Sequence, residues 1–133
     1  AAANRRVAVL GLAFKKDTND FRESAALAVC RRLLQSGLEV VAYDPRVDGT
    51  RFAAELGNPS HFSVASTAAQ ALAGAGAVAV LTEWDEFRAL DFRRLKQEMK
   101  APVIVDLRNI YKSDEMAKYG FSHFPIGKRK AKT

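Results

Sequence analysis

Short apolar runs recur along the chain and predict the strands of a sheet. Four compact runs, in which almost every residue is apolar, predict buried strands at residues 7–12, 38–43, 78–81 and 103–107. Two shorter runs, at residues 62–64 and 122–124, predict short strands, the second of them at an edge. Pro45 closes the second long run, because proline has no amide hydrogen with which to continue a ladder.

Between these runs, apolar residues recur at the spacing of a helix. The clearest helix is predicted at residues 25–35, where Leu27, Cys30 and Leu34 fall on one stripe and Gly37 marks the end. Three weaker patterns predict helices at residues 48–56, 67–72 and 91–99. The segment 82–85 is predicted to be an acidic turn.

The alternation of buried strands with helices predicts an α/β fold. Strands that are apolar on both faces imply a mostly parallel sheet with helices on both sides. Right-handed crossovers then give a doubly wound, Rossmann-like three-layer sandwich. Such sheets bind ligands at the carboxyl ends of their strands, where the strand order switches. This rule directs the search for a site to four segments: residues 13–24, 44–47, 82–86 and 106–111.

The amino-acid composition indicates which class of protein this is. The chain has 133 residues, of which 48% are hydrophobic and 27% charged, and these fractions are typical of one globular domain. We take residues 1–127 as that domain and 128–133 as a basic tail that we expect to be disordered. A single cysteine, no signal-peptide pattern and no apolar run of roughly 20 residues predict a cytoplasmic protein without membrane contact.

The formal net charge of +6 favours an anionic partner. Nucleic acid is not expected, since neither interleaved aromatic residues nor a helix-turn-helix pattern accompanies the charge. The segment 11–24 is a better candidate, because Ser24 can cap the next helix and leave its amide groups facing Lys15 and Arg22. Such an arrangement suits a phosphate or a diphosphate. The alternative is a solvated loop whose charges pair with each other.

A complete NAD site is not expected within this chain. The fingerprint G-x-G-x-x-G is absent, since Gly11 is the one glycine between the first strand and the first helix. Asp44 stands at the end of the second strand, where acidic residues often bind a ribose. Without the glycines, we interpret Asp44 as a turn residue.

Arg108, at the end of the strand 103–107, is a second candidate for anion binding. Its guanidinium can fork onto a phosphate or a uracil carbonyl. The alternative is a structural ion pair with Asp106 or Asp85. The adjacent Asn109 is suited to cap or turn the backbone.

Four further residues receive no chemical role from the sequence. Cys30 lies on the apolar stripe of its helix without a nearby histidine, so we expect a buried structural thiol. His61 and His123 lie near predicted short strands without partners at metal-binding spacing, and no metal site is predicted. Trp84 is expected to pack beneath the site.

Four blocks carry a resemblance to a known family. They are GLAFKKDTNDFRES at residues 11–24, YDP at 43–45, TEW at 82–84 and DLRN at 106–109. In this order they resemble the UDP-glucose/GDP-mannose dehydrogenase family. Within it, F-K-K-D-T-x-D-x-R-E-S and E-W-D-x-F-x-x-L-D are most similar to members that act on UDP-glucose. Many relatives have proline where this chain has Ala25, which is also tolerated at the first helical position.

The resemblance implies a parent protein of three parts: an amino-terminal NAD-binding domain, a central helix that dimerises, and this carboxyl-terminal UDP-binding domain. Such a parent, expected to be a homo-oligomer, oxidises the C6 hydroxyl of UDP-glucose to the carboxylate of UDP-glucuronate with two NAD. The family's nucleophile is a cysteine in G-x-C-[FL]-P-K-D, which no stretch of this chain matches. The isolated chain is therefore expected to be inactive.

The resemblance also implies the binding residues. Phe14 and Lys15 would contact the nucleotide sugar, with Lys15 near the sugar and the phosphates. Arg108 would grip the UDP portion, and Arg22 would reach across the interdomain cleft toward NAD. No catalytic residue and no metal ligand are expected here.

Two alternatives remain at this point. The domain could come from a GDP-mannose or UDP-N-acetylmannosamine dehydrogenase, since these share much of the segment 11–24. It could also be a free-standing nucleotide-binding module without hydride chemistry. Because the chain begins directly before a strand, we expect it to be part of a longer protein.

Overall fold

Six parallel strands form one sheet in the computed structural model, which describes residues 5–13, 17–21 and 24–125. The strands are β1 (Arg6–Leu10), β2 (Glu39–Tyr43), β3 (Phe62–Val64), β4 (Ala77–Val80), β5 (Val103–Asp106) and β6 (Ser122–Phe124). Their order across the sheet is β3-β2-β1-β4-β5-β6, which is that of doubly wound dinucleotide-binding sheets. The predicted fold class is confirmed.

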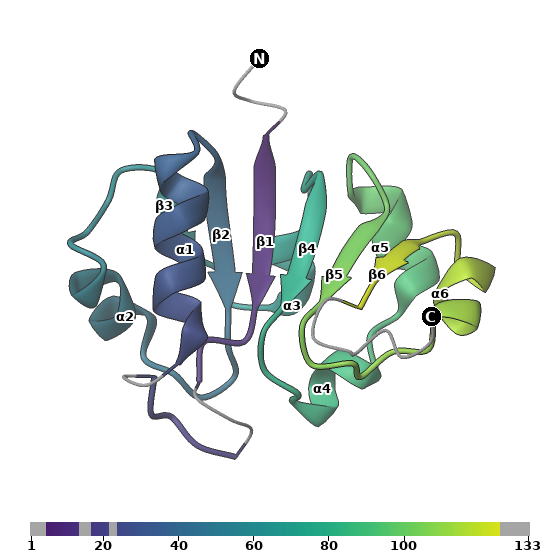
Figure 1. Ribbon diagram of the computed structural model, residues 1–133, viewed down its shortest axis with the longest axis horizontal. Helices are drawn as coiled ribbons and strands as arrows, with labels where there is room; N and C mark the ends of the chain where they lie inside the picture. Colours follow the sequence, from purple (N-terminus) through teal and green to yellow (C-terminus); the bar gives the residue numbers. More distant parts are fainter. Residues whose placement is uncertain (1–4, 14–16, 22–23, 126–133) are drawn as a thin grey trace.

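Helices connect the strands. They are α1 (Ala25–Gln35), α2 (Gly49–Glu55), α3 (Ala68–Leu72), α4 (Asp85–Arg88), α5 (Phe92–Glu98) and α6 (Ser113–Lys118). Figure 1 shows α1 in front of the sheet and α3 behind it, which makes three layers. The chain changes faces in the crossover from β3 to β4, because β4 lies on the other side of β1 from β2 and β3.

The switch in strand order lies at β1, which is hydrogen-bonded to β2 on one side and to β4 on the other. Val9 is in register with Ala42 of β2 and with Ala79 of β4. In doubly wound sheets, ligands bind outside the carboxyl ends of the strands at such a switch. The sequence had directed the search to the carboxyl ends of four strands without placing the switch at one of them.

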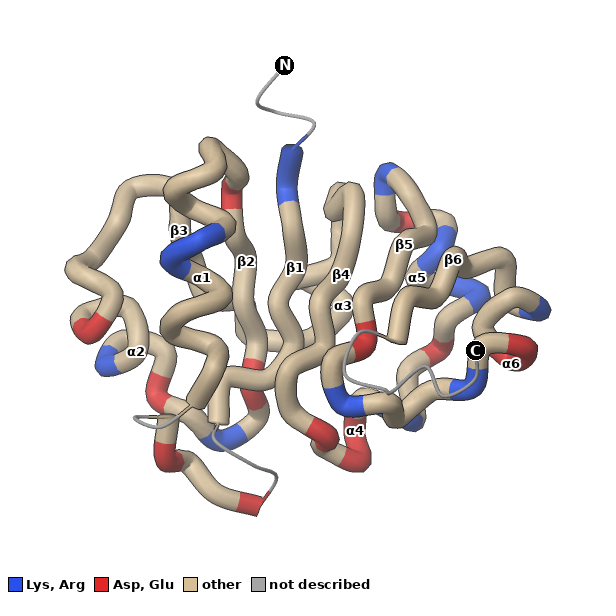
Figure 2. The backbone as a smooth tube through the Cα atoms, in the orientation of Figure 1, with Lys and Arg blue, Asp and Glu red and all other residues tan. Residues whose placement is uncertain are grey.

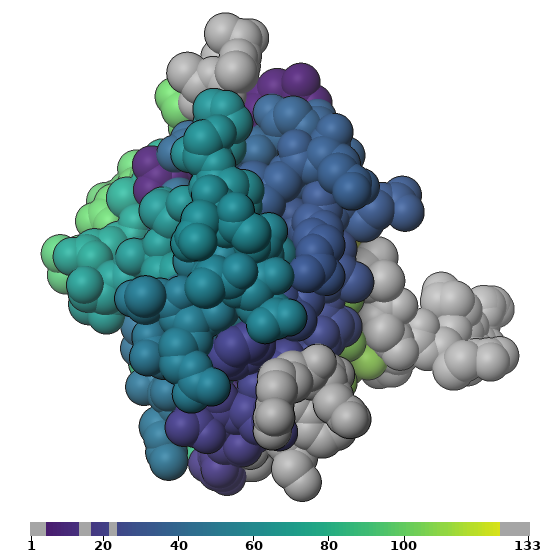
Figure 3. Space-filling view, turned by 90° about the vertical axis from the view of Figure 1, so that its left-hand side faces the viewer, coloured from purple at the N-terminus to yellow at the C-terminus, as the bar shows by residue number. Residues whose placement is uncertain are grey.

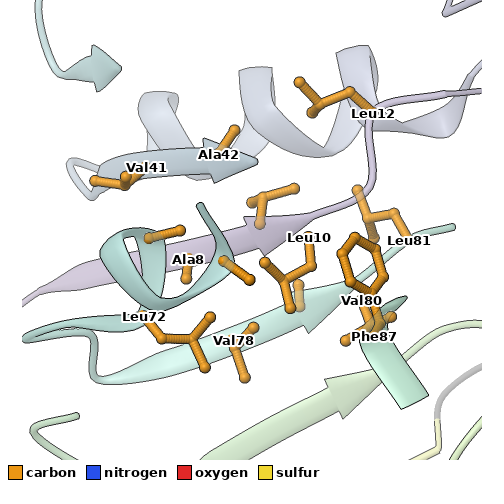
Figure 4. Close-up of a cluster of buried hydrophobic side chains, with 14 of the residues drawn as sticks. Ala8, Leu10, Leu12, Val41, Ala42, Leu72, Val78, Val80, Leu81 and Phe87 are labelled. Carbon is orange, nitrogen blue, oxygen red and sulfur yellow. The ribbon is translucent and has the colours of Figure 1, made fainter. Parts of the chain in front are cut away.

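Side chains of β1 and β4 form the centre of the core. Leu10, Val78 and Val80 are each at most 1% exposed, and Leu72 of α3 packs over them from one face. Figure 4 shows these side chains pointing toward one another between the sheet and α3. Apolar burial on both faces explains why β1 and β4 are continuous apolar runs.

Polar caps set where several helices begin. Ser24 accepts a hydrogen bond from the amide of Ala26 at 2.9 Å and caps α1 as predicted. Asp48, Thr67 and Asp91 accept amide hydrogen bonds in the same way at α2, α3 and α5. The predicted ranges for these three helices included the capping residue, so each helix begins one residue later than expected.

Two helices were not predicted. The segment 82–85 was expected to be a turn, but it leads into α4, whose four residues are too few to show helical periodicity. The six residues of α6 were also missed, and only Met116 among them is buried. Both follow the carboxyl ends of strands, at the edge where a ligand was expected.

The segment after β1 packs against α2, although some 30 residues separate them in sequence. The rings of Phe21 and Phe52 make an edge contact with centroids 5.3 Å apart. Figure 3 shows the purple residues of this segment side by side with blue residues of α2 at the lower end of the molecule. This contact fixes the segment to α2 at Phe21.

The longest helix in the described ranges is α1, with 11 residues. None of the helices there is long and apolar enough to span a bilayer. The basic tail predicted at residues 128–133 lies outside the described residues, so the domain boundary placed at residue 127 stays a prediction.

Candidate functional site at the carboxyl edge of the sheet

The carboxyl ends of the strands share one edge of the sheet, which we call the carboxyl edge. In Figure 1 it is the lower edge, toward which the arrowheads of β1, β2 and β4 point. Figure 2 shows acidic and basic positions gathered in the loops along it. Described parts of all four segments selected from the sequence meet there, through the contacts that follow.

Asp44, directly after β2, holds three of these segments together. Its Oδ2 accepts hydrogen bonds from the amides of Leu12 and Ala13, at 2.7 and 3.0 Å, and from the indole Nε1 of Trp84, at 3.1 Å. Its Oδ1 accepts the amides of Arg46 and Val47, at 2.8 and 2.9 Å, in the turn that it begins. Asp44 is therefore a turn residue, as predicted, and also a link between the loops after β1, β2 and β4.

Trp84 packs beneath the edge as expected, since it is 7% exposed. Its bond to Asp44 was not foreseen. A buried indole N–H needs an acceptor, and the carboxylate at the end of the neighbouring strand supplies one. The pairing of parallel strands β2-β1-β4 brings both residues to one place.

Gly11 and Thr82 make the closest approach between the loops after β1 and β4. Gly11 has φ +100, and a Cβ there would lie 2.6 Å from Thr82 Cβ. The hydroxyl of Thr82 donates to the carbonyl of Ala13 at 2.9 Å and is fully buried. Gly11 thus serves this contact, since a side chain at this position would collide with Thr82.

Tyr43 and Glu86 pair on the outer side of this edge. The phenol of Tyr43 donates to the Glu86 carboxylate, with oxygen distances of 2.8 and 3.0 Å. Burial, this hydrogen bond and the negative charges of Glu86 and Asp44 raise the pKa of Tyr43 to about 12. The phenol stays protonated near neutral pH and connects β2 to α4.

Arg108 lies at the carboxyl edge, two residues beyond β5. Its Nε and Nη2 face Glu83, at 3.0 Å from Oε1 and 3.4 Å from Oε2, in a forked pair. The sequence had proposed Asp106 or Asp85 as the partner in a structural pair. Both were wrong, because Val80 and Asp106 are in register, and this register brings the residues that follow β4 and β5 side by side.

The Arg108 side chain is 43% exposed, so its guanidinium remains open to a ligand. Two of its five N–H donors face Glu83, and the geometry of the fork suits a second oxyanion as well as a carboxylate. Asn109 follows at φ +57, a left-handed conformation that asparagine tolerates and that turns the backbone, which is one of the two roles that the sequence left open.

Asp106 shapes the turn that carries Arg108. Its Oδ1 accepts the amides of Arg108 and Ile110, both at 3.2 Å, and its Oδ2 accepts the amide of Tyr111 at 3.0 Å. Oδ2 also lies 3.0 Å from His123 Nε2. Asp106 is completely buried, so this acid supports the turn from below and does not face a ligand.

Tyr111 closes this turn against α4. Its hydroxyl donates to the carbonyl of Phe87 at 2.6 Å. Burial raises the pKa of Tyr111 far above its usual range; the charge of Asp106 acts in the same direction and that of Arg88 opposes it. The turn 106–111 is thus held at its two ends, by Asp106 and by Tyr111.

Phe14, Lys15 and Arg22, which the sequence predicted to bind the nucleotide sugar and NAD, lie outside the described residues. Their flanks are described: Ala13 is bonded to Asp44, and Ser24 caps α1. The segment that contains them therefore begins and ends at the carboxyl edge. The predicted contacts of these three residues stay predictions.

Cys30 is fully buried, and burial raises its thiol pKa to about 12, which confirms the prediction of a structural thiol. His61 is exposed just before β3. In the described part of the chain, no group of three or more His, Cys, Asp or Glu is placed to hold a metal. The contacts of His123 and Glu83 were missed, although the strand order, once known, would have indicated both.

Comparisons with known proteins identify the family to which this chain belongs. The UDP-glucose/GDP-mannose dehydrogenase family, UDP binding domain, matches residues 8–113. The UDP-glucose 6-dehydrogenase of Rhizobium meliloti is 48% identical over 123 residues, which cover 92% of this chain and 27% of that protein.

Two solved structures are similar to the whole fold. The UDP-glucose dehydrogenase of Pyrobaculum islandicum has a TM-score of 0.68 and 33% identity over 84% of this chain and 23% of that one. The NDP-N-acetyl-D-galactosaminuronic acid dehydrogenase of Methanosarcina mazei has a TM-score of 0.76 and 29% identity, over 93% and 25% respectively. This chain thus spans about a quarter of the length of these relatives. It belongs to the UDP-glucose/GDP-mannose dehydrogenase family and forms the UDP-binding domain of that family.

Proposed function

We propose that this chain is the part of a UDP-glucose 6-dehydrogenase that binds the UDP portion of the substrate. The observation that carries the proposal is the partly exposed guanidinium of Arg108 at the carboxyl edge, two strands from the switch in strand order, where two of its five N–H donors face Glu83. A fork of this kind matches a diphosphate or a uracil carbonyl. Lys15 and Phe14, in a segment whose flanks lie at the same edge, would complete the contacts to the nucleotide sugar.

The parent protein would oxidise UDP-glucose to UDP-glucuronate with two NAD. An amino-terminal domain would hold most of the NAD, and a central helix would join two subunits, as the family resemblance implies. This chain contributes Arg22 toward NAD. It contributes no nucleophile, because its single cysteine is buried and its thiol pKa is raised.

The choice of glucose rests on the relative from Rhizobium meliloti, a UDP-glucose 6-dehydrogenase that is 48% identical to this chain. The same binding residues would also suit a dehydrogenase of another nucleotide sugar, such as GDP-mannose or UDP-N-acetylmannosamine. The base and the diphosphate would meet this chain, whereas the sugar ring would lie nearer to the absent domains. Nucleotide preference is therefore testable on this chain alone.

Calorimetric titration of the 133-residue chain with UDP, and in parallel with GDP, tests the proposal. We expect weak binding of UDP and weaker binding of GDP. Arg108→Ala and Lys15→Ala should each cost about 1.5–3 kcal/mol of binding free energy, the usual value of a hydrogen bond to a charged group. Arg32→Ala, which removes an exposed arginine from the last turn of α1, is the matched control and should bind as the wild type does.

Equal UDP affinity in all four proteins would contradict the site. A preference for GDP would point to a different nucleotide sugar. The same chain, mixed with UDP-glucose and NAD, should form no reduced nicotinamide. Measurable reduction would show that the chemistry does not need the absent domains.

A further inference from the structure

His123 takes part in a buried chain of hydrogen bonds beneath the turn that carries Arg108. Its Nε2 lies 3.0 Å from Asp106 Oδ2, and its Nδ1 lies 2.6 Å from the hydroxyl of Ser113 at the start of α6. The side chains of His123 and Asp106 are 3% and 0% exposed. A buried polar side chain needs a hydrogen-bond partner, and His123 and Asp106 serve as partners for each other.

The direction of these hydrogen bonds follows from the chemistry of the groups. An ionised carboxylate only accepts hydrogen bonds, so facing one, His123 Nε2 carries a hydrogen and its N–H donates a hydrogen bond to Asp106. In the neutral imidazole, Nδ1 then accepts from the Ser113 hydroxyl. The ring also lies at right angles to that of Tyr111, with centroids 6.4 Å apart. Three contacts therefore fix the orientation of His123.

Asp106 connects His123 to the backbone of the turn that carries Arg108. Its other three hydrogen bonds come from the backbone amides of Arg108, Ile110 and Tyr111, so the position of the carboxylate determines the path of residues 108–111. Without a donor at Nε2, Oδ2 would keep one bond, and the carboxylate could rotate about its Cα–Cβ and Cβ–Cγ bonds. Rotation of the carboxylate would move the backbone of Arg108.

We propose that His123 is a positioning residue for nucleotide binding: it holds Asp106, and Asp106 holds the turn that directs Arg108 at the UDP portion. This inference rests on the proposed function, because it assumes that Arg108 contacts the nucleotide. It assigns to β6, an edge strand, a part in the site through His123. His123 acts only through Arg108.

Variants of His123 test the inference through this dependence on Arg108. His123→Leu removes the donor and keeps an apolar side chain, whereas His123→Gln places an amide N–H near the position of Nε2. His61→Leu is the matched control, since His61 is an exposed histidine just before the opposite edge strand, β3. Titration with UDP, followed by backbone amide NMR shifts, reports the affinity and the folded state of each variant in one experiment.

We expect His123→Leu to weaken UDP binding about fivefold, the effect of losing one buried hydrogen bond. His123→Gln should stay within about twofold of the wild type, and so should His61→Leu. In the Arg108→Ala background, His123→Leu should have almost no further effect, because the group that it positions is absent. If His123→Leu does not fold, His123→Asn replaces it, since its shorter amide does not reach Asp106.

Two results would overturn the inference while leaving the proposed function intact. One is unchanged UDP affinity in a folded His123→Leu or His123→Asn variant. The other is an equal loss of affinity with and without Arg108, which would mean that His123 acts independently of it. Absence of UDP binding by the wild type would instead overturn the proposed function, so the two failures are distinguishable.

Discussion

Two buried aspartates organise the two halves of the carboxyl edge, and they differ in what they connect. Asp44 follows β2 and joins three segments that are distant in sequence, through the amides of Leu12 and Ala13 and the indole of Trp84. Asp106 ends β5 and accepts from three amides within the next five residues and, from a distant segment, bonds to His123. Asp44 therefore stabilises the fold, whereas Asp106 shapes one turn.

The partners of the two acids also differ in chemistry. Trp84 has a single polar side-chain atom, the indole nitrogen, and its N–H donates to Asp44, so Trp84 links Asp44 to no further polar group. The imidazole of His123 links Asp106 to α6 through Ser113. The turn at Asp106 carries Arg108. A substitution on this side should therefore change ligand affinity more than it changes the free energy of unfolding. The next three predictions test this difference.

The largest expected effect comes from Asp44→Asn compared with Asp106→Asn. At both sites, each carboxylate oxygen accepts from at least two N–H groups. Whichever oxygen the NH₂ of asparagine replaces, it therefore faces at least two donors and accepts from neither. We expect Asp44→Asn to lower the free energy of unfolding by about 3 kcal/mol and Asp106→Asn by about 2 kcal/mol, because only the first separates whole segments. Urea unfolding, with unchanged m-values, measures both. A greater loss at Asp106 would reverse the comparison.

A smaller effect is expected within the Asp44 half from Gly11→Ala. The new Cβ would lie 2.6 Å from the backbone nitrogen and Cβ of Thr82, at a φ of +100. We expect a loss of about 2–3 kcal/mol from strain and overpacking. Gly37→Ala is the control: its φ is +85 with nothing within 4 Å, so it should cost about 1 kcal/mol from the backbone alone. Thermal unfolding of both variants measures the difference, and equal costs would show that the contact with Thr82 is not tight.

The smallest effect concerns the alkaline stability of the two halves. Tyr43 and Tyr111 both have raised pKa values in the folded chain, so each stabilises the fold fully below its unfolded pKa of about 10. This contribution is lost as the pH rises toward the folded pKa. Tyr43 is partly exposed and its contribution is screened, whereas Tyr111 is more deeply buried.

We therefore expect Tyr111→Phe to reduce the loss of stability between about pH 8 and about pH 11, and Tyr43→Phe to reduce it less. Urea midpoints measured at both pH values give the two losses, and tyrosinate absorbance shows which phenols ionise before unfolding. Identical losses in the wild type and in Tyr111→Phe would mean that another group governs alkaline unfolding.

Much of this molecule could be predicted from its sequence. Strands β1 and β4 are buried on both faces, so continuous apolar runs predict them. The capping residue Ser24 likewise predicts the start of α1. The identity of Cys30 as a buried thiol followed from its place on an apolar stripe. These features depend on neighbours within a few residues, and local patterns record them well.

The contacts between loops could not be predicted in the same way. Arg108 was recognised as a candidate, but its partner Glu83 was not, because 25 residues separate them and only the register of β4 with β5 brings them together. The helices α4 and α6 were missed because four and six residues are too few for periodicity. The sequence assigned no role to His123, because its partner Asp106 is distant in sequence.

The sequence by itself determined the fold class and the family of the chain, because apolar periodicity and local blocks of residues lie in consecutive positions. Only the tertiary structure decided which carboxylate meets which donor. Parallel strands place the ends of β2, β1, β4 and β5 side by side regardless of their distance along the chain. The clusters around Asp44 and Asp106 are products of that arrangement, and hydrogen bonds of this kind form only after the sheet has set their partners within reach.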